Sequence, residues 1–469
     1  MRIVFSIFTF VYFILITFEI FNFKGYESLF LMICALINLL LASYLLKKKN
    51  TLILLNPIFF LFVASNISIL LRAYYMVYDA GPLIEYELRR GLPIVDFIIP
   101  TILIFISLVC FLMGFETKRF ENIAFGTKTI WSDKNIVGIS LVLVCFSLLG
   151  IGLFIYTILG SLSVESILAN ISGKRFATVA SGASEERLSF GYLRWLGSLS
   201  NYSTFILLIH FYHKGKRFSS VKVLLLVISI SLSVFFPFFN SERSSLIIFF
   251  FGILIILYVY KELTFTKLAV SGIIILFLFT ITTLLRSQSN NTIDITSHNP
   301  IEKLVVNKNL FGVAKTAHIY HYINANKNYQ YGLSFITFLF APIPKSLWLD
   351  KPDLIPGKKI GLEVFDSKVA GVPPGIVAEL YWNFDLIGIF FGSFFIGYLV
   401  KLILNRFKLL NEDLSINPSS LLYLLFIIFN LSFKLFGGSF SQTFIGLLTG
   451  LIPCYFIIRF LSKTYLLKQ

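Results

Sequence analysis

Charged residues, cysteines and acidic side chains are all scarce in this sequence. Only 14% of its 469 residues are charged and 57% are hydrophobic, whereas roughly 25% of a soluble protein is charged. This composition excludes a soluble enzyme with one membrane anchor, because apolar segments follow one another from end to end. We therefore expect a polytopic membrane protein, whose length does not translate into a number of soluble domains.

Motifs for metals and nucleotides are missing as well. The four cysteines stand singly inside apolar runs, so no disulfide framework and no thiolate metal site is predicted. Neither HExxH, GxxxxGK[ST] nor GxGxxG occurs. His318 and His321 have no acidic residue or cysteine close in sequence, which favours a surface pair over a metal site and leaves either histidine as an alternative base. We predict neither a metal nor a cofactor.

Basic residues outnumber acidic ones, 40 to 24. In a soluble protein this excess would indicate nucleic acid, but in a membrane protein it should mark cytoplasmic loops and sites for anionic ligands. With the N-terminus in the cytoplasm, inside segments carry 20 Lys and Arg residues and short outside loops carry nine. The sequence therefore predicts a multi-pass plasma-membrane protein with both termini cytoplasmic and no nucleic-acid partner.

Twelve segments are apolar and long enough to be transmembrane helices, which need about 20 residues each. The predicted spans are residues 3–23, 29–46, 52–71, 94–115, 136–160, 195–213, 221–239, 244–260, 268–285, 386–405, 420–437 and 442–462. The first is interpreted as a helix and not a signal peptide, because no small-residue cleavage site follows it. The seventh and eighth are separated only by a short polar turn, and totals from 11 to 14 fit the pattern.

The predicted spans divide the chain into three parts. Residues 1–285 hold nine helices and an outer loop at 161–194, residues 286–385 form a large extracytoplasmic loop, and residues 386–469 hold the last three helices. Loops of this size tend to be folded or functional.

The large loop itself carries helical signals. Apolar residues recur at helical spacing over 301–313, and the short apolar run 335–340 suggests an interfacial or re-entrant helix. The predicted fold class is therefore all-α, with short amphipathic helices inside the loop.

Four arginines are expected outside, near the membrane surface: Arg187, Arg194, Arg243 and Arg286. Guanidinium groups bind phosphate oxygens bidentately and stay charged, so such a cluster suits a lipid diphosphate. Arg194 starts an apolar run, where snorkelling to the headgroups is at least as good an explanation. Glu242 is close enough in sequence to neutralise Arg243.

Glu379 and Asn383 are four residues apart and share a predicted helical face, beside Tyr381 and Trp382. A carboxylate at a membrane boundary with aromatic neighbours suits a general base acting on a sugar hydroxyl. An interfacial helix with an aromatic belt and one solvated glutamate explains the same residues equally well.

Two stretches resemble motifs of bacterial oligosaccharide repeat-unit polymerases, the O-antigen polymerase (Wzy) type. Residues 341–352 read APIPKSLWLDKP and resemble P-(R/K)-x-x-W-x-x-K-P, whereas residues 379–385 read ELYWNFD and resemble E-x-Y-x-N-F/Y-G with Asp385 at the glycine position. The turn NSERSS at 240–245 is similar to an upstream S-x-R-S/T turn. The order of helices and loops is similar over nearly the whole chain.

The resemblance implies an enzyme that joins undecaprenyl-diphosphate-linked oligosaccharides on the outer face of the bacterial inner membrane. The growing O-antigen or capsule-type glycan leaves its lipid diphosphate and is transferred to a sugar hydroxyl of the next lipid-linked unit, without metal or nucleotide sugar. The implied partners are this lipid-linked oligosaccharide, membrane lipids, and a chain-length regulator and flippase of the same pathway.

On this hypothesis Arg243 and Arg286 stabilise the departing diphosphate, while Glu379 orients or deprotonates the acceptor hydroxyl. These three are the predicted catalytic residues of the glycosyltransferase. The predicted substrate-binding residues are Arg187, Arg194, Lys345, Lys351, Tyr381 and Asn383.

Other functions stay open at this point. An O-antigen ligase, which moves finished glycan to another acceptor, shares the fold and the need for outer arginines. A lipid-oligosaccharide flippase also has about twelve helices, but generally lacks so large an external loop. Glu19 and Asp96 are the few acidic residues within the predicted spans, which counts against a proton-coupled transporter. A scaffold role predicts that no single outer arginine is essential.

Overall fold

The computed structural model is built almost wholly of helices. The structure describes residues 2–47, 56–78, 81–117, 130–159, 191–215, 218–239, 243–264, 266–267, 270, 305–306, 311–343, 347–348, 350–352, 356–366, 371–406 and 417–463. Among these residues, only β1 (Ile130–Trp131) and β2 (Ser462–Lys463) are strands, and they pair antiparallel. The predicted all-α fold class is therefore confirmed.

Nine helices among the described residues are long and apolar enough to cross a membrane, which agrees with a multi-pass membrane protein. In chain order they are α1 (Arg2–Phe21), α2 (Tyr26–Lys47), α3–η2–α4 (Pro57–Ser65, Asn66–Leu71, Arg72–Tyr78), η4–α6 (Ile94–Phe97, Ile98–Glu116), α7 (Asp133–Leu159), α12 (Ser220–Phe239), α19–η8–α20 (Ile376–Ile387, Gly388–Gly392, Ser393–Arg406), α21–η9–α22 (Pro418–Phe429, Asn430–Lys434, Leu435–Gly437) and α23 (Phe440–Leu461).

Of the other three predicted spans, two form shorter helices and one lies almost wholly outside the described residues. The segment 195–213 forms α10 (Gly191–Gly197) and α11 (Leu199–His213), and 244–260 forms the short α13 (Arg243–Val259). The prediction at 268–285 lies outside the described residues, apart from residue 270.

The tenth predicted span starts ten residues earlier than expected, inside the predicted loop. Gly375 precedes α19 with a φ of 76°, which glycine adopts without strain, and lets the helix begin at Ile376 directly after two prolines. Asp385, placed at the end of the loop by the sequence, instead forms a kink within the helical run, with φ 54° and ψ −142°.

The described part of the large loop contains short helices, as the sequence suggests. They are α16 (Val313–Asn326), α17 (Leu333–Ile336), η7 (Thr337–Phe340) and α18 (Gly357–Glu363). The predicted short helix at 335–340 is thus present as α17 and η7, whereas the expected amphipathic stretch at 301–313 is described only at 305–306 and 311–313, where α16 begins. Between α4 and η4 lie α5 (Pro82–Ile84) and η3 (Glu85–Arg89).

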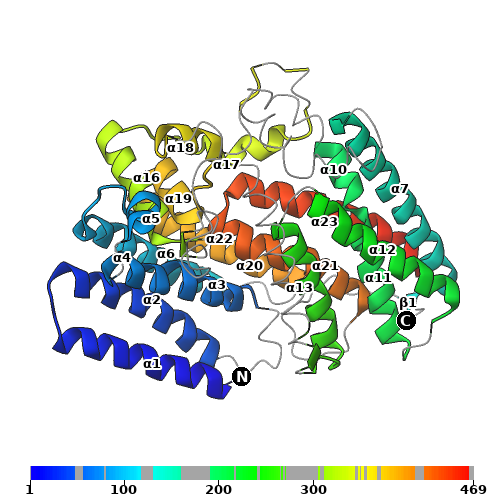
Figure 1. Cartoon of the computed structure of the whole chain (residues 1–469), viewed down its shortest axis with the longest axis horizontal. Helices are drawn as coiled ribbons and strands as arrows, with labels where there is room; N and C mark the ends of the chain where they lie inside the picture. The colour runs from blue at the N-terminus through cyan, green and yellow to red at the C-terminus, as the bar shows by residue number, and fades with distance from the viewer. Residues whose placement is uncertain are drawn as a thin grey trace.

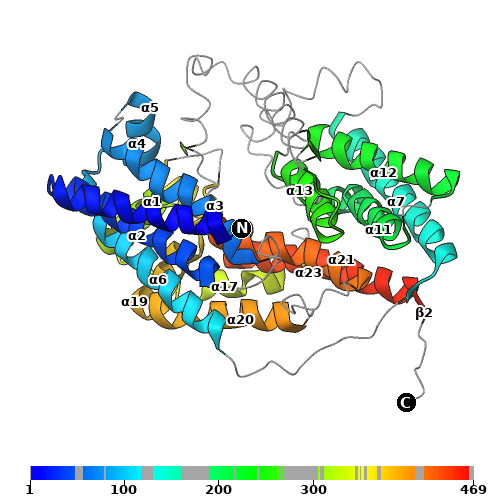
Figure 2. The same cartoon turned by 90° about the horizontal axis from the view of Figure 1, so that it is seen from below.

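The helices form two groups on either side of α21 and α23, as Figures 1 and 2 show. One group contains α1 to α6, α16, α19 and α20, and its first core includes Cys34, Leu108 and Val400. The other contains α7 and α11 to α13, and its second core includes Ile206 and Cys454. Side chains of α21 and α23 enter both cores, so these two helices join the groups.

Small residues bring α6 and α20 into backbone contact in the first group. A Cβ on Gly114 would lie 1.9 Å from the Phe394 carbonyl oxygen, and one on Gly397 would lie 2.0 Å from that of Phe111. The Ser107 and Ser393 hydroxyls are 2.7 Å apart in the same interface. Close packing through small and hydroxyl-bearing residues is typical of helix pairs in membranes.

The segments between the helices gather at two ends of the bundle, which we call the loop end and the strand end. At the loop end, α16 of the large loop binds the chain near Leu88 and Asp96 and the break between α22 and α23. At the strand end, β1 pairs with β2, and the starts of α7 and α12 meet the end of α11. Segments predicted outside thus meet at the loop end, and segments predicted inside meet at the strand end.

Candidate functional site

Glu379 lies at the loop end and has no exposed surface. Its Oε1 accepts a hydrogen bond from the Ser334 hydroxyl and its Oε2 accepts one from the Phe440 backbone N–H, both at 2.7 Å. The carboxylate therefore connects α17, α19 and the first residue of α23. A buried carboxylate requires such donors, because burial without them is strongly unfavourable.

Asn383, one turn further along α19, completes the same network. Its side-chain NH₂ donates to the Ser334 hydroxyl at 2.8 Å and to the Glu379 carbonyl at 2.7 Å, while its Oδ1 accepts from the Gly332 backbone N–H at 2.9 Å. The predicted common face of Glu379 and Asn383 is confirmed. Ser334 was missed by sequence reasoning, although a serine directly before the apolar run 335–340 was a usable signal.

The two aromatic residues beside Glu379 face the protein interior. The Tyr381 hydroxyl donates to Asn324 Oδ1 at 2.9 Å, and the Trp382 indole N–H donates to the Asn328 carbonyl at 2.8 Å. Only 5% of Tyr381 and 2% of Trp382 is exposed. The alternative of an aromatic belt with a solvated glutamate is therefore wrong, because all three side chains are buried inside the protein.

Part of the other motif packs on the same loop segment. The ring of Trp348 contacts that of Phe340 at 5.4 Å between centroids, and Lys351 Nζ donates to the Ile343 carbonyl at 2.5 Å. Burial lowers the pKa of Lys351. Lys345 lies outside the described residues, so its role stays a prediction.

The four predicted arginines are described unevenly. Arg187 and Arg286 lie outside the described residues, and Arg243 is the first residue of α13 with only its backbone described. Arg194 lies on α10, with its guanidinium carbon 5.6 Å from the centre of the Phe154 ring. Convergence of the arginines on one diphosphate therefore stays a prediction.

The end of the smaller outer loop does reach the large loop. Tyr192, two residues before Arg194, places its hydroxyl 3.4 Å from the Pro342 carbonyl oxygen. Two predicted outside segments from different helix groups are thus neighbours.

Two buried cations at the loop end were not considered as site residues. Arg72 Nε donates to the Val305 carbonyl at 2.8 Å, and Lys315 Nζ donates to the Gly437 carbonyl at 2.7 Å. Burial and the nearby charge of Arg72 lower the pKa of Lys315 to about 7. Sequence reasoning treated Arg72 as a loop charge, although it is 1% exposed at the start of α4.

The two histidines of α16 attach the large loop to the helix bundle. The Nε2–H of His318 donates to the Leu88 carbonyl at 2.8 Å and that of His321 to the Asp96 carbonyl at 2.9 Å. His318 is 9% exposed, so the expected surface pair is wrong for this residue. Within the described ranges, no group of three or more His, Cys, Asp or Glu residues could hold a metal ion.

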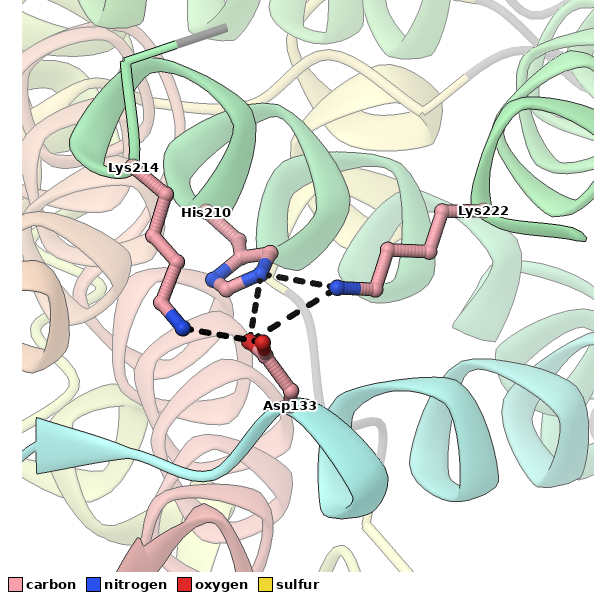
Figure 3. A network of polar contacts seen from close by, with 4 residues as sticks. All are labelled: Asp133, His210, Lys214 and Lys222. Carbon is pink, nitrogen blue, oxygen red and sulfur yellow. Dashed lines mark hydrogen bonds and ion pairs between the residues drawn. The ribbon is translucent and has the colours of Figure 1, made fainter. Parts of the chain in front are cut away.

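A second polar network lies at the strand end and is drawn in Figure 3. Asp133 Oδ1 is 3.0 Å from His210 Nε2 and 3.6 Å from Lys222 Nζ, and its Oδ2 is 2.9 Å from Lys214 Nζ. Asp133 is the first residue of α7, His210 lies in the last turn of α11, Lys214 directly follows that helix, and Lys222 lies in the first turn of α12. The sequence assigned these lysines to topology alone, and the structure adds that they connect three helices.

The chain matches no protein-family model, no curated protein and no solved structure. The resemblance to repeat-unit polymerases accordingly depends on the motif residues and on where the structure places them.

Proposed function

We propose that the protein polymerises undecaprenyl-diphosphate-linked oligosaccharides at its loop end. An acceptor hydroxyl oxygen forms a bond to the anomeric carbon of the donor glycan, and the bond from that carbon to the diphosphate breaks. The lipid diphosphate departs with the bonding electrons and takes up the hydroxyl proton. The product is an O-antigen or capsule-type chain one repeat unit longer.

The observation that carries this proposal is that the two stretches that resemble polymerase motifs, residues 341–352 and 379–385, both contact the segment formed by α17 and η7. Glu379 and Asn383 bind Ser334 at one end of this segment, and Trp348 contacts Phe340 at the other. Residues far apart in sequence therefore meet at the end of a membrane-embedded bundle, where the cations Arg72 and Lys315 are also buried. A glycosyl transfer from a lipid diphosphate needs a site at such a position.

In this proposal the loop end faces away from the cytoplasm. Positively charged residues are enriched in cytoplasmic loops, and Lys214 and Lys222 lie together at the strand end.

Arg243 and Arg286 stabilise the departing diphosphate, and Arg187, Arg194, Lys345 and Lys351 bind the donor, because charge-assisted hydrogen bonds to phosphate are strong.

Burial refines the role proposed for Glu379. Both carboxylate oxygens are hydrogen-bonded within the protein, to Ser334 and to Phe440. This supports an orienting role, in which Glu379 fixes the loop segment against α23, over direct deprotonation of the acceptor. Asn383 and Tyr381 then shape the sugar-binding surface through the same helix.

Purified protein supplied with lipid-linked repeat units tests the proposal. We expect a ladder of glycan lengths, and Arg243→Ala should abolish extension while the protein still inserts at equal abundance. Arg459→Ala removes the same charge from the exposed last turn of α23 and should leave the ladder unchanged. A normal ladder from Arg243→Ala at equal abundance contradicts its assigned role.

A deletion strain distinguishes the remaining functions. Collapse of surface glycan to a single repeat supports the polymerase. Loss of surface glycan with long lipid-linked chains retained indicates a ligase, and accumulation of lipid-linked repeats on the cytoplasmic face indicates a flippase. Either of the last two results overturns the proposal.

A further inference from the structure

The segment formed by α17 and η7 has its polar and apolar sides reversed relative to a water-exposed helix. Leu333, Ile336 and Leu339 are 45%, 47% and 60% exposed, whereas Ser334 and Thr337 are 4% and 3% exposed. Both sets recur every three residues and are offset from each other by one residue, which is about 100–120° around a helix, so they lie on different faces of the segment. In water this arrangement would expose the residues that normally form a core.

The inward side is fixed by polar contacts, so the orientation is determined by the structure. Ser334 binds Glu379 and Asn383, and the Thr337 hydroxyl lies 2.8 Å from that of Ser441 at the start of α23. The Ser441 hydroxyl in turn donates to the Ser334 carbonyl. Rotating the segment to bury its leucines would break this set of hydrogen bonds.

The position of the segment indicates what covers its outward side. Phe335 packs on Phe440, the first residue of a membrane-spanning helix, at 4.5 Å between ring centroids, and Phe338 packs on Phe444 at 5.2 Å. The segment therefore lies at the level where α23 enters the membrane. No charged residue occurs between positions 328 and 344.

The exposed apolar surface also continues beyond η7. Ile343 and Leu347 are 38% and 80% exposed. Tyr331 and Trp348 flank the surface with exposures of 81% and 37%, and such aromatic side chains are enriched at membrane–water interfaces. The face is thus apolar in the middle and bounded by residues that prefer the headgroup region.

We propose that residues 331–343 are an interfacial element that lies in the outer leaflet and binds bilayer lipid through Leu333, Ile336 and Leu339. The sequence allowed either an interfacial or a re-entrant helix at 335–340, and the exposed apolar face favours a helix that lies along the membrane surface. This assignment does not depend on the proposed reaction. It also connects the membrane to the site, because Ser334 on the inward face of the same segment binds Glu379. Contact with lipid would hold the polar centre at the height of the headgroups.

The loop offers a matched control. Leu362 on α18 is 55% exposed, close to the 60% of Leu339. Its helix reads GKKIGLE and carries two lysines and a glutamate in seven residues, so we expect Leu362 to face water. The two leucines share residue type and exposure and differ in the predicted surroundings.

Environment-sensitive fluorophores attached to single cysteines test this inference. Leu339→Cys and Leu362→Cys are made in a chain whose four native cysteines are replaced by serine or alanine, and are labelled in nanodiscs of phosphatidylethanolamine and phosphatidylglycerol. We expect lipid-borne doxyl groups to quench position 339 several-fold more than position 362, and a water-soluble paramagnetic complex to show the opposite order. Ile336→Cys is the second variant and should behave like position 339.

Three results would overturn the inference. Quenching of position 339 by the aqueous complex alone means that the face is in water. Quenching by neither agent means that protein covers it, as a second copy of the chain would. Protection of position 339 from doxyl lipid by added undecaprenyl phosphate means that the substrate's tail occupies the face instead of bilayer lipid. An inactive but normally quenched protein contradicts only the proposed reaction.

Discussion

At the loop end Glu379 is fully buried and accepts hydrogen bonds from two neutral donors, whereas at the strand end Asp133 is 49% exposed and surrounded by two lysines and a histidine. Each carboxylate connects three segments. Fixed hydrogen bonds stabilise a buried charge without requiring a second buried ion. At an aqueous edge, charged lysine side chains suffice, but each exposed pair contributes little and is weakened by salt.

The two ends also belong to different hydrophobic cores, each with its own buried cysteine. Cys34 has no exposed surface in the first core, which includes the neighbours of Glu379 on α19. Cys454 is equally buried in the second core, close in the structure to the helices that Asp133 connects. The labelling rates of these two thiols therefore measure local opening of the two helix groups separately.

The largest effect is expected from Glu379→Leu. This change leaves the Ser334 hydroxyl and the Phe440 N–H without their acceptor, and each unpaired buried donor costs about 1–3 kcal/mol. We expect the first core to lose about 2–6 kcal/mol, seen as much faster labelling of Cys34 with little change at Cys454. Glu379→Gln retains one acceptor oxygen and should lose less. Equal acceleration at both cysteines would mean that Glu379 does not act locally.

Local sequence patterns were sufficient for the spans and for part of the site. Hydropathy identified nearly all of the long helices, and the four-residue spacing placed Glu379 and Asn383 on one face. Ser334, Arg72 and Lys315 were not identified, because their partners lie 45, 233 and 122 residues away in sequence. Contacts between distant segments depend on how helices pack, which no local pattern encodes.

The contact between the helix break at Gly437 and the large loop could not be predicted from the sequence for the same reason. A run of apolar residues predicts one helix for 420–437 and another from 442, but it does not predict that the carbonyl at the break binds a lysine of the large loop. Burial of that lysine, in turn, is a property of the assembled loop end. The sequence showed Lys315 only as one of ten positive charges in the loop.

Lys315 should make the first core sensitive to pH. Burial and Arg72 lower its pKa in the folded protein to about 7, from 10.5. Between these values the unfolded chain binds a proton that the folded chain has released, so the free energy of unfolding rises with pH by up to about 1.4 kcal/mol per unit. The rise should begin near pH 7 and stop near the ordinary lysine value.

Thermal unfolding followed by circular dichroism across this pH range measures the effect. The midpoint should rise with pH in the wild-type protein and much less in Lys315→Met. Lys358→Met removes an exposed lysine of α18 and should keep the wild-type slope. The same slope in wild type and Lys315→Met would show that another group is responsible.

The smallest effect is expected at the strand end. Asp133→Asn removes the negative charge that faces His210, Lys214 and Lys222, and the Asp133 side chain is 49% exposed, so solvent screens all three interactions. Exposed pairs contribute about 0.2–1 kcal/mol each, so we expect the second core to lose about 1 kcal/mol and Cys454 to label several-fold faster.

Because the carboxylate is half-exposed, about 1 M salt should screen it and accelerate Cys454 labelling in the wild-type protein. Cys34 should not respond, since Glu379 is held by neutral donors away from water. A salt effect at Cys34 equal to that at Cys454 would remove the distinction between a carboxylate held by buried neutral donors and one held by lysines at an exposed edge.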